Sequence, residues 1–138
     1  SVLPFGNRTV IQTMTGAQLE KAFLNGFAPA CNPAVPSGRF PQVAGMKVAY
    51  TCSGTRPLVT GMWKTPHGIG GEAIPIGPGD AIRVVTNDFV STGGDGYGVF
   101  TEGTDVLQPG DNLMQVCADY LAEHSPAAPA VEGRITGP

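Results

Sequence analysis

The chain has 138 residues, a length that fits one domain with a single hydrophobic core. Hydrophobic residues make up 41% of it, which favours a globular fold over a disordered chain. The net charge is −3 at pH 7, whereas binding to nucleic acid needs a basic surface. No apolar run approaches the roughly 18 residues of a membrane span. We therefore expect neither a nucleic-acid partner nor a membrane span.

The first third of the chain predicts a strand, a helix and a long loop. Residues 9–14 are rich in β-branched side chains, which is typical of a strand. Thr15 and Gln18 then match a capping box, which predicts a short amphipathic helix that ends at Asn25-Gly26. Residues 28–45 contain several prolines and predict a loop, and loops of this length in compact domains are often functional.

The rest of the chain predicts three strands and one helix. Residues 46–51 and 58–64 form a hairpin-like pair, and residues 81–86 are the clearest strand. Between these strands, residues 65–80 predict a loop rich in Gly and Pro. A final helix is expected from Asp111 to the stop at Ser125-Pro126, with apolar side chains at helical spacing at Leu113, Val116, Cys117, Tyr120 and Leu121. This order predicts an α+β fold, a single mixed-sheet domain with packed helices over residues 1–138.

The cysteines and histidines show no metal-binding or catalytic pattern. Cys117 lies on the apolar face of the final helix, which predicts a buried free thiol. Cys31 and Cys52 flank the proline-rich loop and are candidates for one disulfide, which requires an oxidising compartment. His67 and His124 are far apart in the sequence, and we expect both to be exposed. No catalytic residue, metal ligand or cofactor site is therefore predicted in this chain.

One glycine-rich loop follows the clearest strand and is the best candidate for a binding site. Gly93, Gly94 and Gly96 surround Asp95, and glycines allow a ligand to approach the backbone closely. A carboxylate can accept hydrogen bonds from both hydroxyls of a ribose, and the aromatic ring of nearby Phe89 or Tyr97 can stack on a base. The alternative is a turn with a capping Asp and two aromatic residues of the core. The local sequence leaves both interpretations open.

Five motifs occur in order along the chain. They are Val2-Leu3-Pro4-Phe5-Gly6-Asn7, Thr15-Gly16-Ala17-Gln18-Leu19, Gly38-Arg39-Phe40-Pro41-Gln42-Val43-Ala44-Gly45, Thr86-Asn87-Asp88-Phe89 through Gly93-Gly94-Asp95-Gly96-Tyr97, and Glu132-Gly133-Arg134-Ile135. In this order they resemble the C-terminal domain of a known family, the 5'-nucleotidase/UDP-sugar hydrolases with their 2',3'-cyclic phosphodiesterase relatives. The resemblance extends over nearly the whole chain.

The resemblance implies a domain that binds the substrate of a two-domain hydrolase. In the family, two aromatic rings sandwich the base, and these would be Phe40 and Phe89 here. The Asp of the Gly-Gly-Asp-Gly loop binds the ribose, which assigns that role to Asp95 in the loop with Gly93 and Gly94. The expected ligand is a nucleoside 5'-monophosphate or a related nucleotide. The expected partner is an N-terminal metallophosphatase domain, which would hold two divalent metal ions.

The resemblance also implies what this chain lacks. The family uses an Asn-Gly-Gly-x-Arg-type segment just upstream of the Leu-Pro-Phe-Gly motif, and this chain starts after that point. We therefore expect a domain that is incomplete at its N-terminus, with apolar surface covered by a partner chain or by homodimerisation. The expected location is extracellular, periplasmic or at the cell surface. Two other functions stay open, namely a stand-alone nucleotide-binding module and a structural or interaction module without catalysis.

Overall fold

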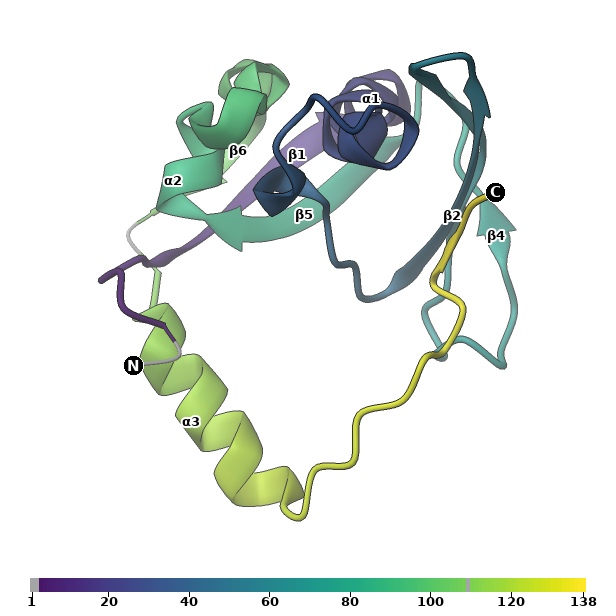
Figure 1. The fold of residues 1–138 in the computed structure, drawn as a ribbon. Coiled ribbons are helices and arrows are strands. Elements are labelled where there is room, and N and C mark those ends of the chain that lie inside the picture. Colours follow the sequence, from purple (N-terminus) through teal and green to yellow (C-terminus); the bar gives the residue numbers. More distant parts are fainter. Residues whose placement is uncertain (1–2, 109) are drawn as a thin grey trace. The chain divides into compact units, whose positions relative to one another are not determined.

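The chain folds into two compact units in the computed structural model, which describes residues 3–108 and 110–138 (Figure 1). Unit 1 comprises Ser1–Met14 and Ile82–Ala130, and unit 2 comprises Thr15–Ala81 and Val131–Pro138. Val2, the first residue of the first motif, lies outside the described residues. The assignment of the chain to one domain that is incomplete at its N-terminus stays a prediction.

Helices and strands are mixed along the chain, which confirms the predicted α+β class. Three short strands, a single-turn helix and the 3-10 helices (η) were not expected from the sequence. The elements are β1 (Thr9–Thr15), α1 (Gly16–Cys31), η1 (Ser37–Arg39), β2 (Met46–Ser53), β3 (Arg56–Lys64), β4 (Ile74–Pro75), β5 (Ala81–Asn87), α2 (Asp88–Ser91), η2 (Gly94–Gly96), η3 (Gly98–Glu102), β6 (Thr104–Leu107), α3 (Leu113–His124) and β7 (Ile135–Thr136).

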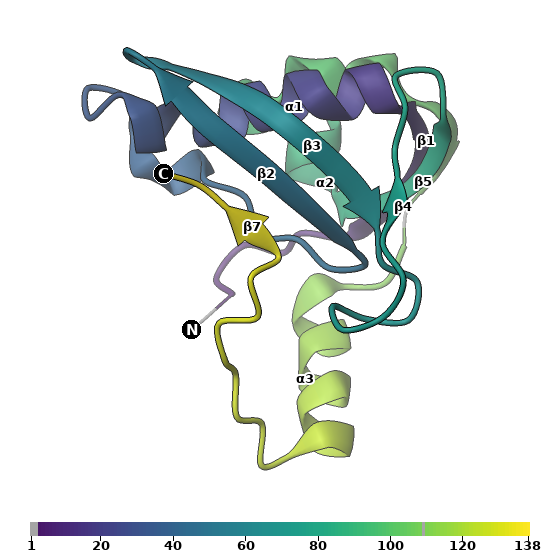
Figure 2. The same ribbon diagram turned by 90° about the vertical axis from the view of Figure 1, so that its right-hand side faces the viewer.

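Unit 2 contains a four-stranded sheet in the order β4-β3-β2-β7. Its centre is the antiparallel pair of β2 and β3, joined by a tight turn in which Gly54 has a φ of 59°. The pair confirms the predicted hairpin. Figure 2 shows β7 beside β2, and these two strands run parallel, so the sheet is mixed as predicted. Helix α1 packs against one face of the hairpin (Figure 2).

Helix α1 begins as the sequence predicts. The Thr15 side-chain hydroxyl accepts a hydrogen bond from the backbone N–H of Gln18 at 3.2 Å. The Gln18 side-chain oxygen accepts one from the backbone N–H of Thr15 at 2.8 Å. The two bonds satisfy two donors that would otherwise lack partners at the helix start. The predicted capping box is therefore confirmed.

The predicted end of this helix at Asn25-Gly26 is wrong, because α1 continues to Cys31 with Pro29 inside it. The reason is the burial of Phe27, which is 0% exposed and stacks on Tyr50 with ring centroids 4.2 Å apart. A glycine and a proline cost a helix interior roughly 1 and 3 kcal/mol. Burying a Phe contributes about 1.5–3 kcal/mol, and a disulfide such as the one at Cys31 roughly 2–4 kcal/mol. Tertiary contacts are thus strong enough to extend the helix past both breakers.

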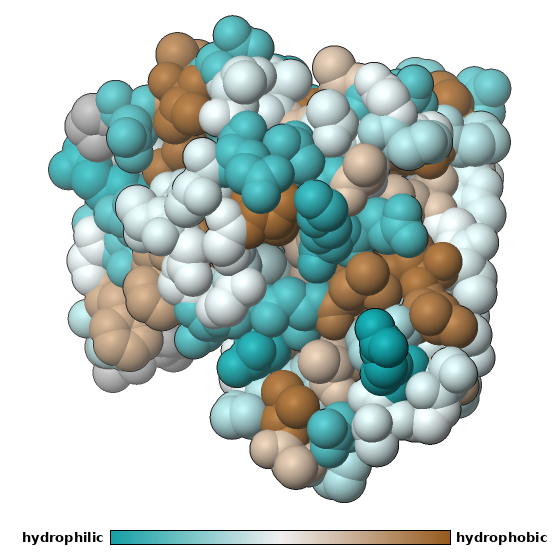
Figure 3. Space-filling model, turned by 90° about the horizontal axis from the view of Figure 1, so that it is seen from above, coloured by the Kyte–Doolittle hydropathy of each residue, from teal (hydrophilic) through white to brown (hydrophobic). Residues whose placement is uncertain are grey.

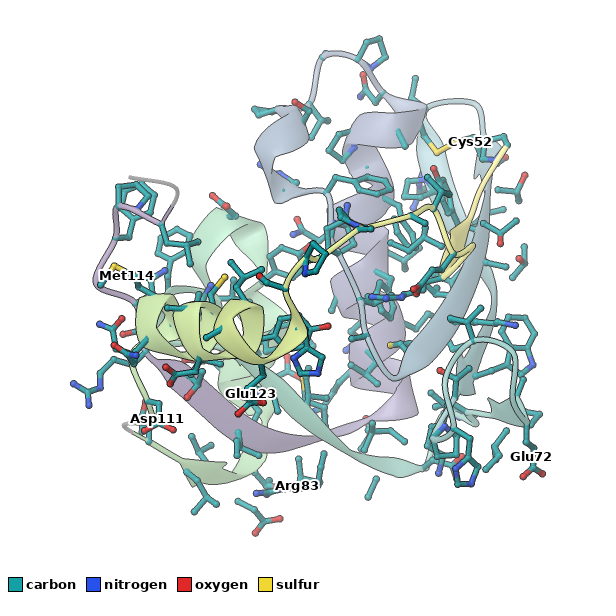
Figure 4. All side chains as sticks on the ribbon, turned by 90° about the horizontal axis from the view of Figure 1, so that it is seen from below. Cys52, Glu72, Arg83, Asp111, Met114 and Glu123 are labelled. Carbon is teal, nitrogen blue, oxygen red and sulfur yellow. A yellow bond between two sulfur atoms is a disulfide. The ribbon has the colours of Figure 1, made fainter. Side chains whose placement is uncertain are left out.

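Unit 1 contains a three-stranded sheet in the order β5-β1-β6, with β1 and β6 antiparallel. Strand β6 was not predicted. The guanidinium of Arg83 on β5, labelled in Figure 4, donates to the Thr13 hydroxyl on β1 at 3.3 Å and to the Asp105 carbonyl on β6 at 3.0 Å. This one side chain therefore reaches across the central strand and ties all three strands together.

Helix α3 is where the final helix was expected, and the side chain of Asn112 caps it by accepting from the Met114 backbone N–H at 3.0 Å. Its residues from Met114 to His124 are all exposed, and Figure 4 shows their side chains as sticks. The prediction that Cys117 is buried is wrong, because its thiol is free and exposed. The apolar spacing predicted the helix correctly, but nothing in the described residues covers that face.

The other cysteines and the histidines agree with the sequence analysis. Cys31 and Cys52 form a disulfide with their Cα atoms 5.5 Å apart, and Figure 4 labels Cys52. His67 and His124 are both exposed. Within residues 3–108 and 110–138, no helix has both the length and the apolar character to cross a membrane.

Large apolar side chains are exposed at several points along the chain rather than in one segment. On the face shown in Figure 3, apolar residues lie in separate clusters divided by polar ones. The predicted partner chain or homodimer therefore stays a prediction. The exposed apolar side chains are those of Phe5, Leu58, Val85, Phe89, Val106, Leu107, Met114, Val116, Tyr120, Leu121 and Val131.

Replacing the capping residue tests the start of α1. We expect Thr15→Ala to lower the free energy of unfolding by about 1 kcal/mol, because the Gln18 backbone N–H loses its acceptor. Thr15→Ser keeps the hydroxyl and should have a much smaller effect. The measurement is denaturant unfolding followed by the circular dichroism of the helices. Equal losses from both variants would contradict the role of the cap.

Hydrogen exchange tests the exposure of α3. A helix shorter than about 12–15 residues is only marginally stable in water unless tertiary contacts support it. We expect the backbone amides of α3 to exchange much faster than those of the buried turns of α1 in the 138-residue chain. Mass spectrometry of peptides from the two helices measures both rates in one sample. Similar protection of the two helices would mean that another surface covers α3.

Candidate functional site

The clearest strand of unit 1 leads directly into the candidate site. At the end of β5, the Asn87 side chain accepts a hydrogen bond from the Val90 backbone N–H at 2.8 Å. This cap starts the single-turn helix α2, in which the Asp88 carboxylate accepts from the Phe89 backbone N–H at 3.0 Å. The turn presents the Phe89 side chain, which remains 49% exposed. An exposed aromatic face can stack on a planar ligand such as a base, so this ring is a candidate for ligand contact.

The glycine-rich loop packs directly against the ring of Phe89. A Cβ atom on Gly94 would lie 2.5 Å from Cε1 of that ring and 2.6 Å from the Phe89 carbonyl oxygen. Only glycine allows this approach, because real Cβ contacts are longer. The Thr92 hydroxyl also donates to the Phe89 carbonyl, at 3.0 Å. One part of the Phe89 ring therefore packs against the backbone at Gly94, and the other part is exposed to solvent.

Asp95 adopts a backbone conformation that non-glycine residues rarely occupy. Its φ and ψ are 53° and 28°, and its neighbours Gly93 and Gly96 have φ values of 95° and 79°. The left-handed region costs a non-glycine residue roughly 1–2 kcal/mol, although Asp tolerates it better than most. Such conformations concentrate at functional sites, where the surrounding structure maintains them. The loop thus holds Asp95 in a backbone conformation that lowers the stability of the fold rather than raising it.

The two aromatic residues that flank the loop have different environments. Tyr97 is 8% exposed and packs edge-on against Phe100, with ring centroids 5.8 Å apart. Tyr97 is therefore a core residue, as the alternative interpretation of the loop expected. Phe89 is half exposed, so that interpretation is wrong for the second ring.

Phe40, the other predicted stacking residue, lies in unit 2 directly after η1. It is partly buried, and its ring centroid is 5.5 Å from that of Phe27 at an interplanar angle of 47°. The structure thus brings Phe89, Gly93, Gly94 and Asp95 together in unit 1. The position of Phe40 is described only relative to the other residues of unit 2.

Two hollows in the described surface contain none of the predicted site residues. In unit 1, a hollow of about 360 Å³ is lined by Arg8, Val10, Asp88 and Gln108. Of these residues, Asp88 directly precedes Phe89 in the sequence. In unit 2, one of about 470 Å³ includes Thr65, whose hydroxyl is buried without a partner among the described residues. Both hollows are open. The loop beside Phe89 is the stronger candidate, because a half-exposed ring, a close glycine contact and the left-handed conformation of Asp95 occur together there. No sequence signal pointed to Thr65.

The His, Cys, Asp and Glu side chains that the structure describes do not gather into a metal site. Within residues 3–108 and 110–138, no group of three or more His, Cys, Asp and Glu side chains lies close enough to hold a metal ion. The described donors therefore do not fit a metal centre, and no chemical step through a metal is assigned to them.

Comparison with known families identifies the domain. The family model described as the C-terminal domain of 5'-nucleotidase matches residues 1–102. The chain belongs to this family. The resemblance inferred from the five motifs is therefore confirmed, and the match includes Phe40 and the Gly93–Gly96 loop.

Similar proteins are nucleotide phosphoesterases by their names. A trifunctional nucleotide phosphoesterase protein of Bacillus subtilis is 36% identical over 143 residues, which cover 98% of this chain and 9% of that protein. A snake venom 5'-nucleotidase of Macrovipera lebetinus is 30% identical over 139 residues, which cover 99% of this chain and 33% of that protein. The chain thus spans about a third or less of the length of these relatives.

Solved structures show the same fold. The 5'-nucleotidase precursor of Thermus thermophilus matches with a TM-score of 0.79 and 31% identity, over 99% of this chain and 26% of that one. The NAD nucleotidase of Haemophilus influenzae matches with a TM-score of 0.75 over 98% of this chain and 25% of that one. The identity in the second case is 19%, so this similarity concerns the fold alone.

The packing of Gly94 against Phe89 is open to a direct test. We expect Gly94→Ala to displace the Phe89 ring, because the new Cβ would lie 2.5 Å from it. Overpacking of this kind costs typically 1–3 kcal/mol of stability. The change should also shift the NMR signals of the Phe89 ring. Gly98→Ala is the matched control, since a Cβ there meets nothing within 4 Å. Unchanged Phe89 signals in Gly94→Ala would contradict the described packing.

Proposed function

We propose that this chain is the nucleotide-recognition part of a metal-dependent 5'-nucleotidase-type hydrolase. The observation that carries the proposal is the unit 1 loop, in which the half-exposed Phe89 ring rests on Gly94 and Asp95 takes a left-handed conformation. Membership of the 5'-nucleotidase C-terminal domain family supports the same function.

The chemistry of this loop suits a nucleoside. A base stacks on an aromatic side chain with a gain of roughly 1–3 kcal/mol per base, largely independent of which base it is. A ring that is already supported on one side loses little freedom on binding, so more of this gain is retained. In the proposal, the open part of Phe89 stacks on the base. The carboxylate of Asp95 accepts hydrogen bonds from the ribose hydroxyls.

Phe40 provides the second aromatic surface in the proposal. Its ring contacts the buried Phe27 and is itself only partly buried, so it also has a supported side and an accessible side. Because stacking tolerates every base, neither ring selects adenine over uracil. Gly93 and Gly94 contribute by allowing the backbone to fold tightly around the carboxylate of Asp95.

The proposal assigns the hydrolysis itself to another domain of the complete hydrolase. In the proposal, an N-terminal metallophosphatase domain holds two divalent metal ions that orient the phosphate and activate water. This chain then binds the nucleoside 5'-monophosphate, or a related nucleotide, and does not hydrolyse it alone. An extracellular, periplasmic or cell-surface location is proposed as well, because disulfides such as Cys31–Cys52 persist in oxidising compartments and a relative is named as a venom protein.

Ligand titration of the 138-residue chain tests the two residue roles separately. We expect adenosine to bind weakly, in the millimolar range typical of a partial site, and Phe89→Ala to weaken it about 5- to 100-fold through loss of stacking. Asp95→Ala should weaken adenosine binding but leave 2',3'-dideoxyadenosine unchanged, because the latter lacks both hydroxyls. Chemical-shift changes in two-dimensional NMR spectra measure both affinities.

Two control variants separate these roles from general damage. Asp105→Ala removes another carboxylate of unit 1 from a left-handed conformation, since the φ of Asp105 is 48°. Phe5→Ala removes a ring that is 73% exposed in the same unit. Both should bind adenosine like the parent chain. If no signal shifts at millimolar adenosine or AMP, the chain is a structural or interaction module instead. An effect of Asp95→Ala that is equal for both nucleosides would refute the ribose role.

A further inference from the structure

The loop of residues 32–45, called the Phe40 loop below, has little regular structure of its own. It connects α1 to β2 and contains only the 3-10 turn η1, which immediately precedes Phe40. A flexible loop loses conformational entropy when it becomes ordered on binding, and that loss weakens affinity. A stacking ring on such a loop is therefore useful only if other residues hold the loop in place.

The first part of the Phe40 loop is fixed to α1 and β2. Cys31, directly before the loop, is bonded to Cys52 on β2. The Asn32 side chain accepts a hydrogen bond from the Ala34 backbone N–H at 3.0 Å, which sets the first turn. Further along, Arg39 donates to the Asn25 side chain on α1 at 3.1 Å. These contacts hold the chain up to the residue before Phe40.

The second part of the loop is fixed by a residue from the other end of the sequence. Nη1 of Arg134 donates to the backbone carbonyl of Val43 at 3.0 Å. The two residues are 91 positions apart in the chain. Val43 lies three residues after Phe40, so this hydrogen bond fixes the loop on the C-terminal side of Phe40.

The guanidinium of Arg134 is itself held in position. Its Nε donates to the Glu132 carboxylate at 2.6 Å, and its Nη2 forms an ion pair with the same carboxylate. The backbone carbonyl of Arg134 accepts a hydrogen bond from the Val48 backbone N–H at 2.9 Å, next to the parallel pair of β7 and β2 (Figure 2). Arginine presents several donors in a rigid plane, so it can bind the carboxylate and the carbonyl at once.

We propose that Arg134 is a positioning residue that holds Phe40 for stacking on the base, through its hydrogen bond to Val43 and its ion pair with Glu132. This inference rests on the proposed function, because it assigns Arg134 a role only if Phe40 contacts the nucleoside. Arg134 does not touch the ligand. It reduces the freedom that the Phe40 loop must lose on binding.

A double-mutant cycle with adenosine tests this role in the 138-residue chain. Phe40→Ala should weaken binding about 5- to 100-fold by loss of stacking. Arg134→Ala should weaken it about three- to tenfold, the effect of leaving one loop side chain unrestrained. The double variant should bind no more weakly than Phe40→Ala alone, since Arg134 acts only through that ring. Affinities come from NMR titration, and thermal unfolding checks that each variant is folded.

Further variants control for charge and for folding. Arg56→Ala removes an exposed arginine from β3 in the same unit and should leave the affinity unchanged. Arg134→Lys should recover part of the affinity, because lysine can bind Val43 or Glu132 but not both in the same geometry. If Arg134→Ala does not fold, Glu132→Gln replaces it in the cycle, since it loosens the guanidinium without removing it. The backbone amides of residues 42–45 should exchange faster in Arg134→Ala and in Glu132→Gln than in the parent chain.

The outcomes separate this inference from the proposed function. If Phe40→Ala binds adenosine like the parent chain, stacking by Phe40 is wrong, and the proposed function loses its second ring. If Phe40→Ala weakens binding but Arg134→Ala does not, the positioning role alone is overturned. The same holds if Arg134→Ala weakens binding equally with and without the Phe40 ring, because the effect would then not pass through that ring.

Discussion

The burial of Phe27 is the constraint on which unit 2 depends. Its ring is 0% exposed and contacts the rings of Phe23, Phe40 and Tyr50, which come from α1, the Phe40 loop and β2. Aromatic pairs of this kind contribute about 0.5–1.5 kcal/mol each beyond the area they bury. One side chain therefore joins the helix, the sheet and the loop that carries a candidate ligand-binding residue. Any change that moves the Phe27 ring would also shift the Phe40 ring, which packs against it.

The parts of the fold that were predictable from the sequence have local causes. The Thr15–Gln18 capping box, the β2–β3 hairpin and the strand before the glycine-rich loop depend on residues close together in the chain, and all three were correctly predicted. The end of α1 was not, because Phe27 overrides Gly26 and Pro29 through contacts with residues far along the sequence. Strand β6 was missed for a similar reason, since it is held by β1 and by Arg83 of β5.

The candidate site was predictable to a different degree in its two parts. The glycines around Asp95 indicated a loop of unusual backbone conformation, and the positive φ values agree with that. The sequence did not distinguish the exposed Phe89 from the buried Tyr97, because burial depends on the packing of Phe100 and the surrounding 3-10 turns. Phe40 was identified as a candidate stacking residue only through the family resemblance. Its contact with Phe27 and the bond from Arg134 to Val43 join residues too distant in sequence for any local pattern.

The Cys31–Cys52 disulfide gives the Phe40 loop one more property, which concerns its covalent topology. Residues 31–52 form a closed ring of chain that includes the whole loop. Exposed loops are preferred sites of proteolytic cleavage. A protease that cut the chain once inside this ring would release no fragment, because the disulfide would still join the two pieces. In any medium that contains a protease, α1 and β2 would remain covalently linked after such a cut, and a reductant would be needed to break that link.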